Sequence, residues 1–152
     1  ADYLARNYLG GESGLRLALA GRNEEKVRRV AEEIGHPELT VVVGDSFDAP
    51  SLDAMASRTE VVISTVGPYA KYGSELVGAC VRNGTDYCDL TGEPHWMRAM
   101  IDAHQEAAAD SGARIVHACG FDSIRFMPPL DLTVREADLA LEVLDQALEV
   151  ID

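Results

Sequence analysis

The sequence predicts an α/β fold, specifically a Rossmann-like doubly wound parallel sheet. The first observation is that short stretches of apolar, β-branched residues alternate with segments whose apolar residues recur at i, i+3 and i+4. The second is that small or polar residues follow each apolar stretch, where open sheets of this kind bind their ligands. Right-handed crossovers between parallel strands make the doubly wound arrangement the expected one.

The composition is that of an acidic, folded domain. The chain has 152 residues, 13 Lys+Arg against 26 Asp+Glu, a net charge of −13, and 47% hydrophobic residues. The acidic balance without a basic stripe excludes nucleic acids and anionic membranes as partners. No apolar run is long enough to span a bilayer and the start does not resemble a signal peptide, so we expect a cytoplasmic protein. The three cysteines have no CxxC spacing and are expected to be buried free thiols.

The first part of the chain is predicted to contain a helix, a strand, a helix, a strand and a short helix. Residues 3–9 have helical spacing and precede Gly10-Gly11, and a strand follows over residues 15–20. Asn23 is a candidate N-cap, and Gly35 is expected to end the helix it begins. The apolar face of that helix is predicted to comprise Val27, Val30, Ala31 and Ile34. A β-branched strand over 40–43 and a short helix over 48–56 complete this part.

The second part repeats the alternation. Residues 61–66 have the clearest pattern of a buried strand, followed by a helix with 76–81 inward and a strand over 85–90. A longer helix begins at Pro94, and a last strand covers 113–118. The inward side of this longer helix is expected to hold Trp96, Met97, Met100, Ile101 and Ala108.

A different pattern begins after Ser123. Pro128-Pro129 does not fit inside a central strand, and Thr133 is a candidate N-cap for a final acidic, leucine-rich helix. We therefore divide the chain into residues 1–124, the α/β part, and 125–152, an extended segment plus a C-terminal helix.

The junction after the strand over 15–20 is the first candidate cofactor site. In a dinucleotide-binding fold the end of the second strand meets the adenosine ribose, where an acid suits NAD and an arginine suits the 2′-phosphate of NADP. Here Gly21, Arg22 and Asn23 stand at that junction. The planar guanidinium of Arg22 matches a phosphate, although an ordinary surface arginine remains the alternative.

Further candidates follow the next strands. Asp45 is placed to meet an adenine amino group or, equally, to form a loop or helix cap. Val66, Gly67 and Pro68 are expected to flank the cofactor, because glycine permits close approach of the backbone. Glu93 is either a substrate-facing carboxylate or, as we favour, an acid near a helix N-terminus. The four histidines have no ligand spacing, so no metal site is predicted, and no catalytic residue is assigned.

Four segments suggest a family. LALAGRN (17–23), VVISTVGPYAKYG (61–73), GTDYCDLTGEP (84–94) and ARIVHACGFDS (113–123) resemble the NADP-binding domain of saccharopine dehydrogenase-like oxidoreductases. Within that family the chain is most similar to actinobacterial trans-acting enoyl reductases. The resemblance implies a Rossmann domain that binds NADP, followed by a catalytic domain.

The chain departs from the family in two ways. The family's first strand and its glycine-rich loop, which holds the pyrophosphate, have no counterpart in the sequence, and neither does the catalytic domain. The strand order 3-2-1-4-5-6 puts the missing strand at the centre of the sheet. We therefore expect its neighbours to pair directly or to leave a gap, and NADP binding to be weak or lost.

The tail resembles a second family. Residues 124–130 and the helix that follows are similar to the C-terminus of class III pyridoxal-phosphate aminotransferases, so the sequence suggests a chimeric chain. No transaminase activity is expected, because the cofactor-binding lysine has no counterpart.

Two functions are compatible with these features. The first is a truncated NADP-binding fragment of an oxidoreductase that is not catalytically complete by itself. The alternative is a non-catalytic α/β domain that self-associates as a homo-oligomer through exposed strand edges and binds no cofactor.

Overall fold

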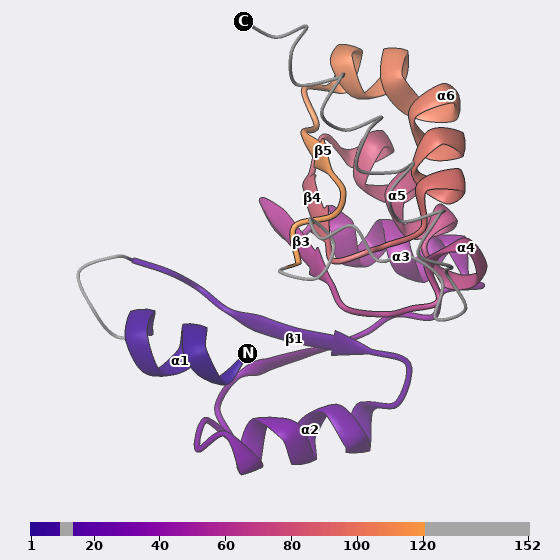
Figure 1. The fold of residues 1–152 in the computed structure, drawn as a ribbon. Helices are drawn as coiled ribbons and strands as arrows, with labels where there is room; N and C mark the ends of the chain where they lie inside the picture. The colour runs from indigo at the N-terminus through magenta and orange to yellow at the C-terminus, as the bar shows by residue number, and fades with distance from the viewer. Residues whose placement is uncertain (10–13, 121–152) are drawn as a thin grey trace, which may run out of the picture.

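The computed structural model describes residues 1–9 and 14–120 and has the α/β architecture that the sequence predicts (Figure 1). The described elements are, in chain order, α1 (Asp2–Tyr8), β1 (Ala18–Gly21), α2 (Glu24–Glu33), β2 (Thr40–Val43), α3 (Ala49–Ala56), β3 (Val61–Ser64), α4 (Tyr69–Tyr72), α5 (Ser74–Asn83), β4 (Asp86–Asp89), α6 (Pro94–Ser111) and β5 (Ile115–Val116). The Gly10-Gly11 helix stop, the Pro-Pro segment, the helix after Thr133 and the boundary at residue 124 lie outside the described residues.

The strands form two parallel sheets. β1 pairs with β2, with Ala18 opposite Thr40, and β4 lies between β3 and β5. In the described part of the chain β1 and β3 share no ladder, so of the two expected outcomes the structure shows the gap. In Figure 1 the β1–β2 pair with α1 and α2 forms one part, and β3–β5 with α3, α5 and α6 forms the other.

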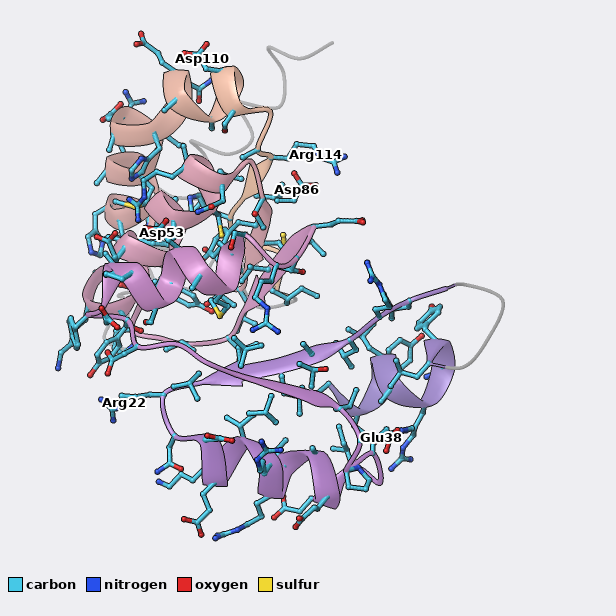
Figure 2. The ribbon with its side chains drawn as sticks, turned by 180° about the vertical axis from the view of Figure 1, so that it is seen from behind. Arg22, Glu38, Asp53, Asp86, Asp110 and Arg114 are labelled. Atoms are coloured by element: carbon cyan, nitrogen blue, oxygen red, sulfur yellow. The ribbon has the colours of Figure 1, made fainter. Side chains whose placement is uncertain are left out.

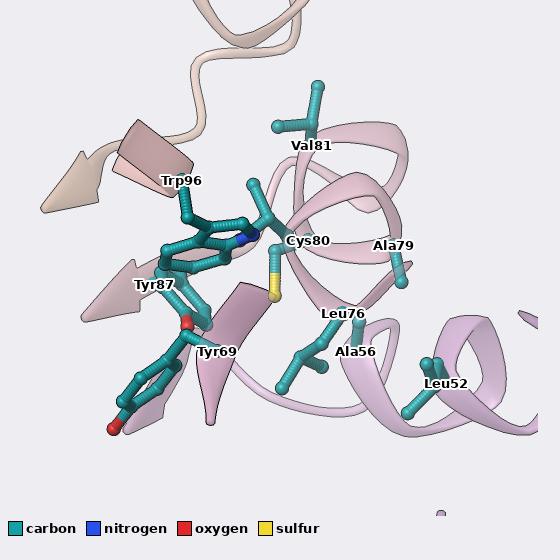
Figure 3. Packing of buried hydrophobic residues seen from close by; sticks show 10 residues of the cluster. Leu52, Ala56, Tyr69, Leu76, Ala79, Cys80, Val81, Tyr87 and Trp96 are labelled. Atoms are coloured by element: carbon teal, nitrogen blue, oxygen red, sulfur yellow. The ribbon is translucent and has the colours of Figure 1, made fainter. Parts of the chain in front are cut away.

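The main core lies between the three-stranded sheet and its helices (Figure 3). α5 is its central element, since Leu76–Val81 are all buried, and Val77, Ala79 and Cys80 have no exposed surface. Tyr87 from β4 and Trp96 from α6 contribute the large aromatic rings. Burying one large apolar side chain contributes about 1.5–3 kcal/mol to folding, so this core stabilises the packing of the helices on β3–β5.

α3 connects the two parts of the sheet. Its Leu52 and Ala56 belong to the main core. On the other side, a Cβ on Gly44, which follows β2, would lie 3.3 Å from the Met55 sulfur and 3.6 Å from Leu52. α3 therefore packs closely against the end of β2 while it contributes to the core of the other part.

Capping residues act as the sequence predicts around α2. Asn23 accepts a hydrogen bond from the Lys26 amide at 2.9 Å. At the other end, Gly35 has a φ of +80°, and the His36 amide bonds to the Ala31 carbonyl. Glycine tolerates this left-handed conformation without the penalty that a Cβ brings.

The prediction that the 61–66 strand is buried is wrong. Val61 is 48% exposed and Ile63 57% exposed. The helices cover the face that carries Val62, Tyr87 and Ile115, whereas Ile63 lies on the other face, which no described element covers.

Other burial predictions also fail. Val30 and Ile101 are exposed although their spacing placed them on the apolar faces of their helices. Of the three cysteines, only Cys80 is buried; Cys88 is half-buried and Cys119 exposed, though all are free thiols. The short helix α4 was not predicted from the sequence.

We predict that Gly73→Ala destabilises the fold. A Cβ there would lie 2.7 Å from Trp96 Cζ2 and 2.9 Å from the Tyr69 carbonyl oxygen, and neither a packed indole nor a backbone atom moves freely. Such overpacking lowers the free energy of unfolding by about 1–3 kcal/mol. Gly92→Ala is the control, because a Cβ on Gly92 meets nothing within 4 Å. Urea unfolding curves should separate the two variants, and equal midpoints would contradict this packing.

Candidate functional site

The end of β1 forms the first part of the candidate site. Gly21 is its last residue, and a Cβ there would lie only 2.8 Å from Val27 Cγ2, so glycine lets α2 pack against the strand. Arg22 is exposed and its side chain points into solvent (Figure 2). Among the described residues its guanidinium has no ion-pair or hydrogen-bond partner. A free guanidinium therefore stands next to the positive N-terminal end of α2, where an anion is favoured.

Asp45 is held in a turn after β2. Its Oδ1 accepts a hydrogen bond from the Phe47 amide at 2.9 Å, and its own amide donates to Ser51 Oγ at 3.1 Å. This geometry favours the loop alternative of the two that the sequence left open.

Val66, Gly67 and Pro68 form an exposed loop after β3. Val66 is 50% exposed, and the peptide bond between Gly67 and Pro68 is cis. Pro68 then leads into α4 as its N-cap. The loop thus presents accessible backbone at the carboxyl end of the strand, as a cofactor-flanking segment requires.

Glu93 has a role that sequence spacing did not reveal. It is the N-cap residue of α6, but its carboxylate accepts the amides of Tyr69 at 2.7 Å and Ala70 at 3.0 Å, at the start of α4. The favoured alternative, an acid near a helix N-terminus, is confirmed, but the helix whose amides the carboxylate accepts is α4 and not α6. The carboxylate ties the loop after β4 to the loop after β3, and its two oxygens are engaged in this contact.

Two aromatic residues, Tyr69 and Trp96, also fix the loops that follow β3 and β4. The Tyr69 hydroxyl donates to the Ser64 carbonyl at 3.1 Å, and burial raises the pKa of Tyr69. The ring of Tyr69 lies 5.5 Å from that of Trp96, whose Nε1 donates to Ser74 Oγ at 2.9 Å. The entrance to α4 is therefore fixed by packing as well as by the Glu93 carboxylate.

The Asp89 carboxylate joins the ends of β4 and β5. Asp89 is 1% exposed, its Oδ1 accepts the amides of Thr91 at 3.1 Å and Ala118 at 3.0 Å, and its Oδ2 lies 2.7 Å from His117 Nδ1. Ala118 has a φ of +60°, a conformation that is unfavourable by about 1–3 kcal/mol for a residue with a Cβ and that these hydrogen bonds stabilise.

Aromatic rings surround the Asp89–His117 pair. The ring of His117 is 4.9 Å from Trp96 and 5.9 Å from Tyr87. Burial and the negative charge of Asp89 raise the pKa of Tyr87. The sequence predicted satisfied or surface histidines, and His117 is satisfied by a carboxylate that lies 28 residues away.

Two cavities lie near these residues without enclosing the predicted cofactor contacts. One of about 270 Å³ runs between α6 and β5 and includes Ile101, His104 and His117. The other, of about 300 Å³, lies between the loop after β2 and α4, with Phe47 and Tyr72 among its walls. Neither includes Gly21, Arg22, Gly67 or Pro68. Gly21 and Arg22 stand at the end of the β1–β2 sheet, whereas Gly67 and Pro68 follow β3 of the other sheet.

Two further features concern metals and membranes. Within residues 1–9 and 14–120, no three His, Cys, Asp or Glu side chains gather as a metal-ligand set. No described helix combines the length and the hydrophobicity needed to cross a membrane.

We predict that Asp89→Asn destabilises the protein by about 2–4 kcal/mol, because an amide cannot accept on both sides and leaves a buried donor unpaired. Asp110→Asn, at the exposed end of α6 (Figure 2), should leave stability nearly unchanged. Thermal unfolding of the two variants tests this. Similar melting temperatures would show that the buried carboxylate does not hold the strand ends.

Comparison with known proteins identifies relatives over most of the chain. Residues 2–116 match the family model described as saccharopine dehydrogenase NADP binding domain. A putative trans-acting enoyl reductase of Mycobacterium tuberculosis is 52% identical over 136 residues, which cover 88% of this chain and 30% of that protein. The trans-acting enoyl reductase of Mycobacterium leprae is 50% identical over 138 residues, 90% of this chain and 31% of that protein. The chain thus spans about 30% of the length of these curated relatives.

The fold has a counterpart among solved structures. Apo saccharopine dehydrogenase (L-Glu forming) from Saccharomyces cerevisiae aligns with a TM-score of 0.64 at 20% identity, over 80% of this chain and 24% of that one. The aminotransferase resemblance of the tail lies outside the described residues and outside the range of the family model, and it stays a prediction. The match over residues 2–116, together with the parallel strands and the glycine-arginine junction after β1, shows that the chain belongs to the saccharopine dehydrogenase NADP-binding domain family.

Proposed function

We propose that this chain is the NADP-binding part of an oxidoreductase of the trans-acting enoyl reductase kind, and that Arg22 recognises the 2′-phosphate. The observation that carries the proposal is the exposed guanidinium of Arg22, which has no partner among the described residues and stands between β1 and the N-terminus of α2. When bound, NADPH supplies a hydride for reduction of a double bond.

The neighbouring residues support this contact in different ways. Gly21 allows α2 to approach the strand closely, which puts the helix N-terminus beside Arg22. Asn23 fixes that terminus by accepting the Lys26 amide. Asp45, at the end of β2, keeps the adjacent turn in shape and has one carboxylate oxygen outside the turn hydrogen bond. Val66, Gly67 and Pro68 present exposed backbone at the end of β3.

The structure also gives a physical reason to expect weak binding. Arg22 stands on the β1–β2 sheet, whereas Gly67 and Pro68 stand on the β3–β5 sheet, and the two share no strand ladder in the described residues. A ligand that contacts both parts must then hold them together itself, and that ordering reduces the observed affinity.

We predict that the chain prefers NADP⁺ over NAD⁺ and that Arg22→Ala removes the preference. A charge-assisted hydrogen bond to phosphate contributes about 1.5–3 kcal/mol, which is roughly tenfold to a hundredfold in affinity. Arg58→Ala is the matched control: Arg58 is also an exposed arginine, but it lies between α3 and the first residue of β3 and does not follow the carboxyl end of a strand. Isothermal titration calorimetry with both dinucleotides measures the two affinities.

The control separates specific recognition from general charge. Arg58→Ala should keep the preference of the unchanged chain. Micromolar NADP⁺ binding that is independent of Arg22, or an equal loss in both variants, would contradict the proposed ribose contact.

Self-association is the second candidate function, and one observation favours it. Ile63 and Val116, with Cys88 between them in register, lie on the face of the β3–β5 sheet that no described element covers, and both are about half exposed. If this face joins two copies, sedimentation should show a dimer that Ile63→Lys converts to a monomer. A monomeric unchanged chain would contradict this candidate.

A further inference from the structure

Two of the three cysteines of the chain lie near the carboxyl ends of the neighbouring strands β4 and β5. Cys88 stands in β4 directly opposite Val116 in β5. Beyond Val116 the chain turns at Ala118, and the Cys119 amide bonds to the Asp89 carbonyl at 2.7 Å. This return brings the Cys119 Sγ to 3.5 Å from the carbonyl oxygen of Val116, the residue that stands opposite Cys88 in the ladder.

The two thiols differ in their access to solvent. Cys119 is exposed, and its Sγ lies 3.5 Å from the Val116 carbonyl. Cys88 is half-buried; burial raises its pKa, and the neighbouring Cys119 adds to the effect. A reagent therefore reaches Cys119 first, and Cys88 stands behind it as a second thiol.

The remaining cysteine is a natural internal control. Cys80 has no exposed surface, lies in the core on α5, and burial raises its pKa to about 12. It is both shielded and almost wholly protonated at neutral pH, so it is inert toward disulfides.

We propose that Cys88 and Cys119 form a redox-active dithiol that a low-molecular-weight disulfide oxidises to an intramolecular disulfide. The Cys119 thiolate attacks one sulfur of the oxidant, for example oxidised glutathione, and displaces the first glutathione thiolate. The Cys88 thiolate then attacks the Cys119 sulfur, forms the Cys88–Cys119 bond and displaces the second. Two protein thiols are oxidised, one glutathione disulfide is reduced to two thiols, and the two cysteine protons end on them.

The position of the bond gives it a structural consequence. Cys119 is bonded to the backbone of Asp89, and the carboxylate of Asp89 holds Ala118 and His117. A disulfide there adds a covalent tie to the ends of β4 and β5, where that carboxylate already joins them. The inference is independent of NADP binding, since it uses none of the residues assigned to the cofactor.

The experiment is incubation of the full chain with oxidised glutathione, followed by alkylation and peptide mass spectrometry. The unchanged chain and Cys80→Ser should both yield a peptide pair linked through Cys88 and Cys119, lighter by two hydrogen atoms than the reduced pair, with no glutathione retained. Cys88→Ser should keep one glutathione on Cys119, because no second thiol displaces it. Cys119→Ser should show no intramolecular bond.

Alkylation rates on the reduced chain give a second readout. Cys119 should react with iodoacetamide at least about tenfold faster than Cys80. Three results would overturn the proposal: glutathione retained on Cys119 of the unchanged chain, a disulfide that involves Cys80 or joins two copies, or a Cys119 that reacts no faster than Cys80.

Discussion

The buried carboxylate of Asp89 is the interaction on which the carboxyl edge of the β3–β5 sheet depends. It receives the Thr91 and Ala118 amides and His117 Nδ1, while the Asp89 carbonyl receives the Cys119 amide. A buried charge of this kind is stable only when its acceptor positions are filled, so the conformations of two loops are set by one side chain. The unfavourable φ of Ala118 persists because these bonds hold it.

Glu93 connects the loops after β3 and β4 through backbone hydrogen bonds, as Asp89 connects the ends of β4 and β5. Its carboxylate caps α4 with two backbone hydrogen bonds and thereby ties the segment after Pro68 to the start of α6. Together the two carboxylates order one edge of the three-stranded sheet. No comparable tie joins this edge to Arg22 on the β1–β2 sheet in the described residues, where α3 is the connecting element. Each candidate cofactor-binding segment therefore has a defined local conformation, but the segments stand on two sheets that no strand ladder joins in the described residues.

Local patterns predicted the parts of the fold that depend on local interactions. The Asn23 cap, the Gly35 stop and the parallel strands followed from turn chemistry and apolar periodicity, and the segments 17–23 and 84–94 led to the correct family. Burial of Ile63 was predicted wrongly, because apolar character does not show which face of a strand another element covers. The Glu93 cap on α4 was missed, since its partners lie 23 and 24 residues away. The Asp89–His117 pair escaped for the same reason: its spacing along the chain has no short motif.

The central claim is that the end of β1 and the loop after β3 hold NADP, with the Arg22 guanidinium on the 2′-phosphate. Amide-resolved NMR of the whole chain during titration with NADP⁺ tests it most directly. If NADP⁺ binds there, the amides of Gly21, Arg22 and Asn23 should shift most, those of Val66 and Gly67 should follow, and NAD⁺ should produce smaller shifts at Arg22. Shifts confined to the cavity between α6 and β5, or identical responses to the two dinucleotides, would contradict it.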